Sequence, residues 1–96
     1  MKLEGELQAK IMSWLKAHRH DIWSLKVVGN ALQTTGVPDI ILCKNGRFVG
    51  IELKRPDGKG RTREVQKAHL RRINNAGGIG VVINDYDEFL KLMEEI

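Results

Sequence analysis

The dipeptide Asn45-Gly46 lies between two mostly apolar runs and constrains the fold of this chain more than any other feature. Asn-Gly favours a two-residue type I′ turn, because both central residues need positive φ angles. Such a turn fixes the register of its two strands, so that residues equally far from the turn face each other. Asp39 then lies opposite Glu52, with Lys54 on the same face as Glu52.

This register predicts two carboxylates side by side. Directly opposed side chains have Cβ atoms about 5 Å apart, where like charges destabilise the pair unless a positive charge lies between them. A divalent cation would supply that charge. The alternative is an edge hairpin whose acids point into water, with Lys54 as a local counter-charge. Residues 40–43 and 48–53 carry apolar side chains on both faces, so we expect central strands covered on both sides and partly desolvated carboxylates.

The length of 96 residues corresponds to a single domain spanning residues 1–96, with a modest core that a dimer would supplement. No apolar run approaches the ~20 residues of a membrane span, and the N-terminal segment is charged and amphipathic, unlike a signal peptide. We therefore expect a cytoplasmic protein. The single cysteine, Cys43, cannot form an internal disulfide and is expected to be a small core residue.

Hydrophobic periodicity and turn residues predict the order helix, three strands, helix, strand, helix. We expect Thr62 to cap the second helix and Asp85, with Glu88 three residues later, to begin the third. The pattern indicates an α/β fold with a mixed sheet of about four strands flanked by helices. The expected ranges are 3–18, 22–28, 39–44, 47–54, 62–76, 79–83 and 85–96.

The second helix places a polar side chain within its apolar stripe. Val65, His69, Ile73 and Ala76 form the expected inward stripe, and Gln66 falls inside the same arc. An unsatisfied buried amide costs on the order of 1 to 3 kcal/mol. We therefore expect Gln66 to point toward the acids, the alternative being a glutamine whose end reaches solvent, and we interpret His69 as a packing residue.

Charge is unevenly distributed along the chain. Residues 54–72 contain eight lysines and arginines and only two acids, whereas residues 84–96 contain five acids and one lysine. A basic stretch that begins at a candidate metal site indicates a polyanionic substrate, because each Lys or Arg can neutralise a phosphate. The alternative is a solvated helix face. The candidate DNA-binding residues are Arg55, Lys59, Arg61, Arg63 and Lys67.

The candidate ligands favour a hard cation. Asp39 and Glu52 offer carboxylate oxygens, without the thiolates and imidazoles that zinc prefers, so Mg²⁺ (or Mn²⁺) fits best. Lys54 could stabilise negative charge in a phosphoryl transition state as an ammonium. With a depressed pKa, Lys54 could instead accept a proton from the attacking water, and the sequence leaves both roles open.

These residues together resemble the VRR-NUC family of the PD-(D/E)XK nuclease superfamily, and the resemblance covers nearly the whole chain. The compact form is similar to the stand-alone members found in bacteriophages and bacteria. One departure is Thr62-Arg63, where the family often has a serine shortly before the glutamine. The segments that carry the resemblance are Glu6-Leu7-Gln8, Gly36-Val37-Pro38-Asp39, Glu52-Leu53-Lys54-Arg55, Gln66 and Gly77-Gly78.

The resemblance implies a restriction-endonuclease-like core and a Mg²⁺- or Mn²⁺-dependent DNA endonuclease, related in fold to archaeal Holliday-junction resolvases. By position, it implies metal ligation by Asp39, Glu52 and the backbone carbonyl of Leu53, and makes Lys54 the catalytic lysine. It also implies that Gln66 and Glu6 support the site, with Glu6 binding metal through water. Periodicity alone favours an ordinary surface pair between Glu6 and Lys10.

The predicted function is therefore a structure-selective DNA endonuclease in a bacterial cell or a phage-infected host. Resolving a four-way junction requires two cuts, which a homodimer could provide. The alternatives are a flap or nicking nuclease, or a non-catalytic nucleic-acid-binding module. Binding alone needs neither Asp39 nor Glu52, and both acids repel phosphate.

Overall fold

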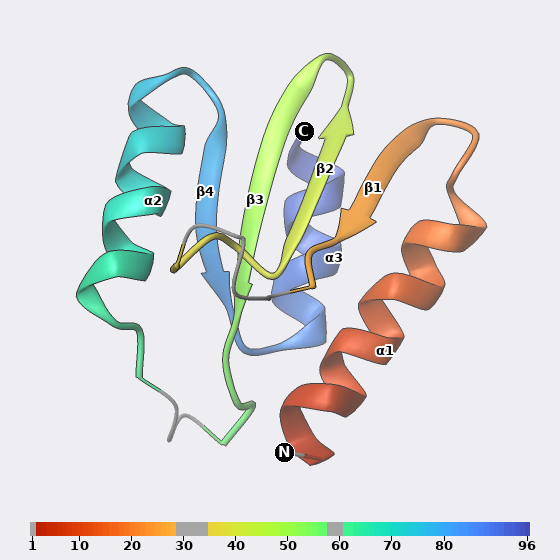
Figure 1. The fold of residues 1–96 in the computed structure, drawn as a ribbon. Helices are drawn as coiled ribbons and strands as arrows, with labels where there is room; N and C mark the ends of the chain where they lie inside the picture. Colours follow the sequence, from red (N-terminus) through yellow and green to blue (C-terminus); the bar gives the residue numbers. More distant parts are fainter. Residues whose placement is uncertain (1, 29–34, 58–60) are drawn as a thin grey trace.

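The computed structural model describes residues 2–28, 35–57 and 61–96, and it has the predicted element order (Figure 1). The observed boundaries lie within about two residues of the predicted ones. The elements are α1 (Lys2–Ala17), β1 (Ile22–Lys26), β2 (Ile40–Lys44), β3 (Arg47–Leu53), α2 (Glu64–Asn75), β4 (Ile79–Ile83) and α3 (Tyr86–Glu95).

The four strands form one mixed sheet in the order β1-β2-β3-β4. The pairs β1–β2 and β2–β3 are antiparallel, whereas β4 runs parallel to β3 after the α2 crossover. Asn45 and Gly46 have φ angles of 53° and 77°, and Leu42 pairs with Val49. The turn type and the register predicted from Asn-Gly are therefore confirmed.

The core lies between one face of the sheet and the helices α1 and α3 (Figure 1). Alternate residues of each strand point into this layer, as the two-residue period of a strand requires. Helix α3 begins where expected, because the Asp85 side chain accepts a hydrogen bond from the Asp87 amide at 2.8 Å. The buried side chains of this core are Leu7, Ile11, Leu15, Ile22, Ile40, Leu42, Val49, Ile51, Leu53, Ile83, Phe89 and Met93.

Helix α2 packs on the opposite face, over β3 and β4, and two glycines permit its close approach. A Cβ atom at Gly80 would lie 2.6 Å from the Leu70 carbonyl oxygen, and one at Gly50 would lie 2.7 Å from Cδ1 of Ile73. The side of α2 that faces the sheet therefore includes Leu70 and Ile73. The predicted stripe is wrong at its ends, since Val65 and Ala76 are exposed.

Because α2 covers only β3 and β4, none of the helices in the described residues lies over the outer face of β1 and β2. The prediction that both hairpin strands are covered on both sides is confirmed for the second half of β3 and wrong for β2. Cys43 is exposed, so its expected place in the core is also wrong. Trp23 and Leu25 share this outer face and are exposed as well.

The start of α2 differs from the prediction by one residue. Arg63 and not Thr62 is the N-cap, and the side-chain oxygen of Gln66 accepts a hydrogen bond from the Arg63 amide at 2.9 Å. This contact satisfies the backbone N–H of the N-cap residue, as the side chain at the third helical position does in a capping box. In the described part of the chain, no helix is both long and apolar enough to cross a membrane.

Candidate active site

Three elements bring the predicted site residues together on the α2 face of the sheet. Asp39 directly precedes β2, Glu52 and Lys54 lie at the end of β3, and Gln66 lies in the first turn of α2. The hairpin register places Asp39 beside the end of β3, and the crossover brings the N-terminus of α2 over the same end of the sheet. The structure thus gathers four of the predicted residues from separate parts of the chain.

Glu52 is the most buried of these residues, with 3% of its surface exposed. Its Oε2 accepts a hydrogen bond from Gln66 Nε2 at 2.7 Å and lies 3.5 Å from Lys54 Nζ. Its Oε1 is buried and has no hydrogen-bond partner among the described residues. Burial is the main cause that raises the pKa of Glu52 to about 7, the nearby charge of Asp39 adds to the rise, and Lys54 opposes it.

Asp39 is held next to Glu52 by backbone contacts. Its Oδ2 accepts a hydrogen bond from the Leu53 amide at 2.8 Å, and its carbonyl oxygen accepts one from the Val27 amide at 2.8 Å. The resemblance implied a role for the Leu53 carbonyl, whereas this contact uses the amide of the same residue. A hydrogen bond between a side chain and a backbone amide does not depend on a repeating residue pattern. The contact between Asp39 and the Leu53 amide therefore could not be predicted from residue spacing.

Gln66 connects the two charged groups of β3 to the helix. Its Oε1 accepts hydrogen bonds from Lys54 Nζ at 3.1 Å and from the Arg63 amide at 2.9 Å, while its Nε2 donates to Glu52. The prediction that Gln66 points toward the acids is confirmed, and its amide is satisfied on both ends. Lys54 is thereby held beside Glu52 with only 15% of its side chain exposed.

This arrangement fits a divalent cation. A desolvated carboxylate beside a second acid has a raised pKa because two negative charges share a poorly hydrated space, and a bound cation would relieve that cost. The orphaned Oε1 of Glu52 offers a free buried oxygen. Within residues 2–28, 35–57 and 61–96 no three His, Cys, Asp or Glu side chains cluster. Two carboxylates suffice for Mg²⁺, which commonly keeps several waters.

Glu6 lies apart from this cluster. It is exposed on α1 and lines a polar pocket of about 460 Å³. Lys10, its expected surface partner, places Nζ 5.6 Å from the centre of the Tyr86 ring. The supporting role of Glu6 stays a prediction. The other residues that line this pocket are Leu7, Lys10, Pro56, Asn84, Asp85 and Tyr86.

Basic side chains surround the first turn of α2, next to Gln66. Arg61, Arg63 and Lys67 are exposed and line a groove of about 690 Å³. Lys67 lies 3.6 Å from the carboxylate of Glu64. Arg55 is paired with Asp57 at 2.7 Å, and Lys59 lies outside the described residues.

Comparison with known proteins identifies a fold. No protein-family model matches the sequence, and no curated protein matches it. Solved structures with a similar fold include two that each share 21% sequence identity with this chain. One, described as "VRR_NUC domain", has a TM-score of 0.74 and covers 95% of this chain and 94% of its own. The other, "VRR_NUC domain protein", has a TM-score of 0.76 and covers 97% of this chain and 86% of its own. The chain therefore has the fold of a VRR_NUC domain over nearly its whole length.

Proposed function

We propose that the chain is a VRR-NUC nuclease, a divalent-metal-dependent, structure-selective DNA endonuclease that acts on branched DNA as a homodimer. One observation carries this proposal: Glu52 is buried with an unbonded oxygen, and Asp39, Lys54 and Gln66 surround it. A buried acid with a raised pKa beside a specific charge partner is characteristic of functional sites.

Asp39 and Glu52 are the side chains that would hold Mg²⁺ or Mn²⁺. When bound, such an ion supplies a water of lowered pKa and withdraws charge from a phosphate oxygen. The Leu53 amide orients Asp39, and Gln66 Nε2 orients Glu52, so neither acid would have to reorganise on binding. Fixed ligands lower the entropic cost of assembling the site.

Lys54 would stabilise the negative charge that develops on the phosphate. Its Nζ is held by Gln66 Oε1 and by Glu52, in a position where little water competes for it. A preorganised cation in a partly buried site interacts more strongly with developing charge than a solvated one does. The exposed basic residues of the α2 N-terminus would bind neighbouring phosphates and bring the backbone to this site.

A module that only binds nucleic acid is less well supported. Two adjacent carboxylates at the edge of a phosphate-binding surface weaken binding by repulsion. Their presence is reasonable only if a cation is held between them, which is a requirement of hydrolysis and not of binding. Holliday-junction resolution in particular is favoured by the resemblance, and it requires two cuts and hence two sites.

A gel assay tests the proposed activity. Labelled four-way junction, flap, linear duplex and single strand are each incubated with Mg²⁺, Mn²⁺ or a chelator. We expect cleavage of the four-way junction with either metal and none with the chelator. Cleavage of the flap alone would replace junction resolution with flap cleavage, and binding without cleavage under every condition would contradict a nuclease.

The variant Lys54→Ala tests the site itself. We expect it to abolish metal-dependent cleavage while DNA affinity, measured by fluorescence anisotropy, stays within a few-fold of wild type. Lys91→Ala, which removes an exposed lysine from α3, is the matched control and should cut normally. Undiminished cutting by Lys54→Ala would refute the role assigned to Lys54.

A further inference from the structure

The outer face of β1 and β2 presents a continuous apolar surface. Pairing across the strands aligns Trp23 with Cys43 and Cys43 with Phe48 in one row, and Leu25 with Ile41 in the next. Trp23 is 58% exposed, Leu25 49% and Phe48 43%. Figure 1 shows why: α2 lies beside β4, at the far side of the sheet from β1.

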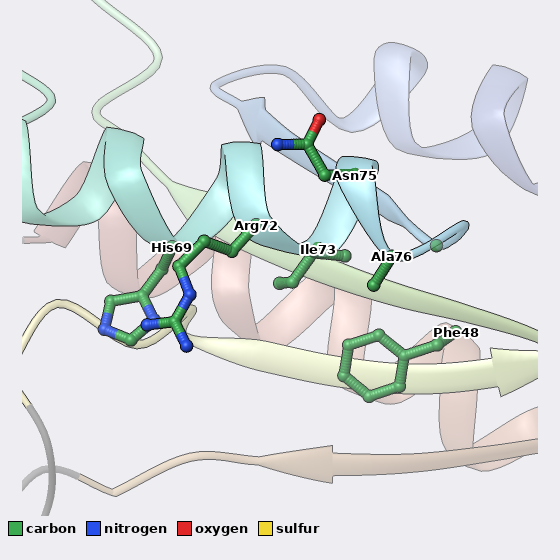
Figure 2. A pocket seen from close by; sticks show the side chains of 7 residues that line it. Phe48, His69, Arg72, Ile73, Asn75 and Ala76 are labelled. Atoms are coloured by element: carbon green, nitrogen blue, oxygen red, sulfur yellow. The ribbon is translucent and has the colours of Figure 1, made fainter.

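A groove borders this surface at one end of the first row. It has a volume of about 710 Å³ and lies between Phe48 of β3 and the C-terminal half of α2. In Figure 2 the side chains of Arg72, Ile73 and Ala76 extend toward the side on which the Phe48 ring lies, while Asn75 points away. Apolar atoms, an aromatic ring and a guanidinium are the partners that an aromatic side chain prefers.

We infer that this face is the interface with a second copy of the chain, in which Trp23 of each copy enters the groove of the other. The inference specifies the surface of the homodimer in the proposed function and rests on that part of it. Trp23 is the most exposed aromatic side chain that the structure describes on this face, and the groove offers the chemistry that would bind it.

The apolar surface is large enough for the centre of such an interface but not for the whole of it. Aromatic side chains present about 150 to 250 Å² each, so the exposed parts of Trp23 and Phe48, together with the exposed half of the aliphatic Leu25, sum to on the order of 300 Å² of apolar area. The largest apolar patch on a monomeric protein is commonly about 300 to 600 Å² and is often functional. A stable interface needs about 800 Å² per partner, with an apolar centre and a polar rim. The row residues supply the centre, and Arg72 and His69 supply part of the rim.

The arrangement along the row is also self-complementary. In a two-fold dimer, if residue i contacts residue j of the partner, then j contacts i. Trp23 and the groove lie at opposite ends of one row with Cys43 between them. A two-fold axis that passes near Cys43 and runs close to the strand direction exchanges these ends. Each Trp23 then meets the partner's groove, and the two Cys43 thiols become neighbours.

Two structural consequences follow from this axis. Helix α2 rises above its own sheet on the interface side, so it would flank the partner's β1, which is an edge strand of the sheet that the structure describes. Rotation about the strand direction does not exchange the two ends of a strand. Both Asp39–Glu52 sites would therefore lie at the same end of the dimer, where one branched DNA molecule could reach both.

Oligomeric state gives the first test. We expect wild-type protein at micromolar concentration to sediment as a dimer and Trp23→Lys to sediment as a monomer with an unchanged circular dichroism spectrum. The fold should survive because Trp23 is largely exposed within one copy. The control is Val28→Lys, which places the same charge on another exposed apolar residue, beyond the end of β1, and should stay dimeric. A monomeric wild type, or a dimeric Trp23→Lys, would overturn the inference.

Cross-linking tests the axis. A short thiol-reactive bismaleimide should link Cys43 of the two copies in wild type and give no product with Cys43→Ser. Adding Ser13→Cys to Cys43→Ser puts the only thiol on the exposed side of α1, and this control should not cross-link. Cross-linking through position 13 but not through Cys43 would place the interface on the other face. A wild-type protein that is monomeric and still cleaves DNA would refute this inference alone, whereas a Cys43-linked wild-type dimer without cleavage would refute only the proposed nuclease.

Discussion

Glu52 is a buried residue whose hydrogen bonding the described part of the chain leaves incomplete. Gln66 bonds one of its oxygens, and the other has no donor among the residues described. A buried carboxylate without enough partners costs stability. This cost lies next to Asp39, where the proposed cation would offset it by binding the oxygen that no described donor reaches.

The pKa of Glu52 leads to a measurable effect of pH on stability in metal-free buffer. Its pKa is raised from 4.5 to about 7, so the folded chain holds a proton that the unfolded chain releases. This contribution is fully present below pH 4.5 and is lost as pH rises through 7, with an upper bound of about 3 kcal/mol. Urea unfolding of wild type and Glu52→Gln with a chelator would measure it.

The Gln variant cannot titrate at this position, so its free energy of unfolding should rise relative to wild type across that pH window. Mg²⁺ added above pH 7 should stabilise wild type and leave Glu52→Gln nearly unchanged. Parallel stability profiles for the two proteins, with and without metal, would mean that Glu52 titrates normally.

At the scale of the elements, the features that neighbouring residues determine could be predicted from the sequence, whereas the position of the crossover helix α2 on the sheet could not. Asn45-Gly46 determines a turn and a register through the φ angles of two adjacent residues, so the opposition of Asp39 and Glu52 could be predicted. The apolar pattern of β2 contains no information about which strands α2 packs against. Cys43 looks like a core residue by sequence and is exposed because α2 packs over Gly50 of β3 and Gly80 of β4, one and two strands further along the sheet.

The N-terminus of α2 supports a prediction about DNA binding. Replacing Arg61, Arg63 and Lys67 with Ala should weaken binding to every DNA structure and reduce the slope of log K against log salt by roughly one for each phosphate that is no longer neutralised. The pair of Lys67 with Glu64 is solvent-exposed and should not hold Lys67 back from a phosphate. Anisotropy titrations over a series of salt concentrations would measure the slope.

A matched triple variant controls for net charge. Lys16, Arg19 and Lys91 are exposed on α1, the turn after it and α3. Their replacement by Ala removes the same charge from the +4 chain at a distance from the candidate site. Equal slopes of log K against log salt for the two triple variants would mean that the basic residues at the start of α2 form a solvated face and do not bind phosphates.

On the scale of the whole molecule, basic, acidic and apolar side chains gather in different regions of the surface. The basic residues gather at the start of α2 near the acids of the site, whereas α3, on the far side of the sheet, carries acids in its first turn and at its end. The apolar rows occupy the part of the α2 face that the helix leaves uncovered. One face of the sheet would thus bind DNA at its catalytic end and a second copy along β1 and β2.

This division predicts that disrupting the dimer uncouples the two cuts while each active site stays able to cut. On a supercoiled plasmid whose inverted repeat extrudes a cruciform, wild type should produce linear DNA by cutting twice within one bound complex. Trp23→Lys should accumulate nicked circles, because each monomer cuts once and the released supercoiling resorbs the cruciform before a second encounter. Val28→Lys should behave as wild type, and a substrate that needs one cut should be cleaved at similar rates by all three proteins. Linear product from Trp23→Lys at the wild-type rate would show that paired cutting does not depend on this interface.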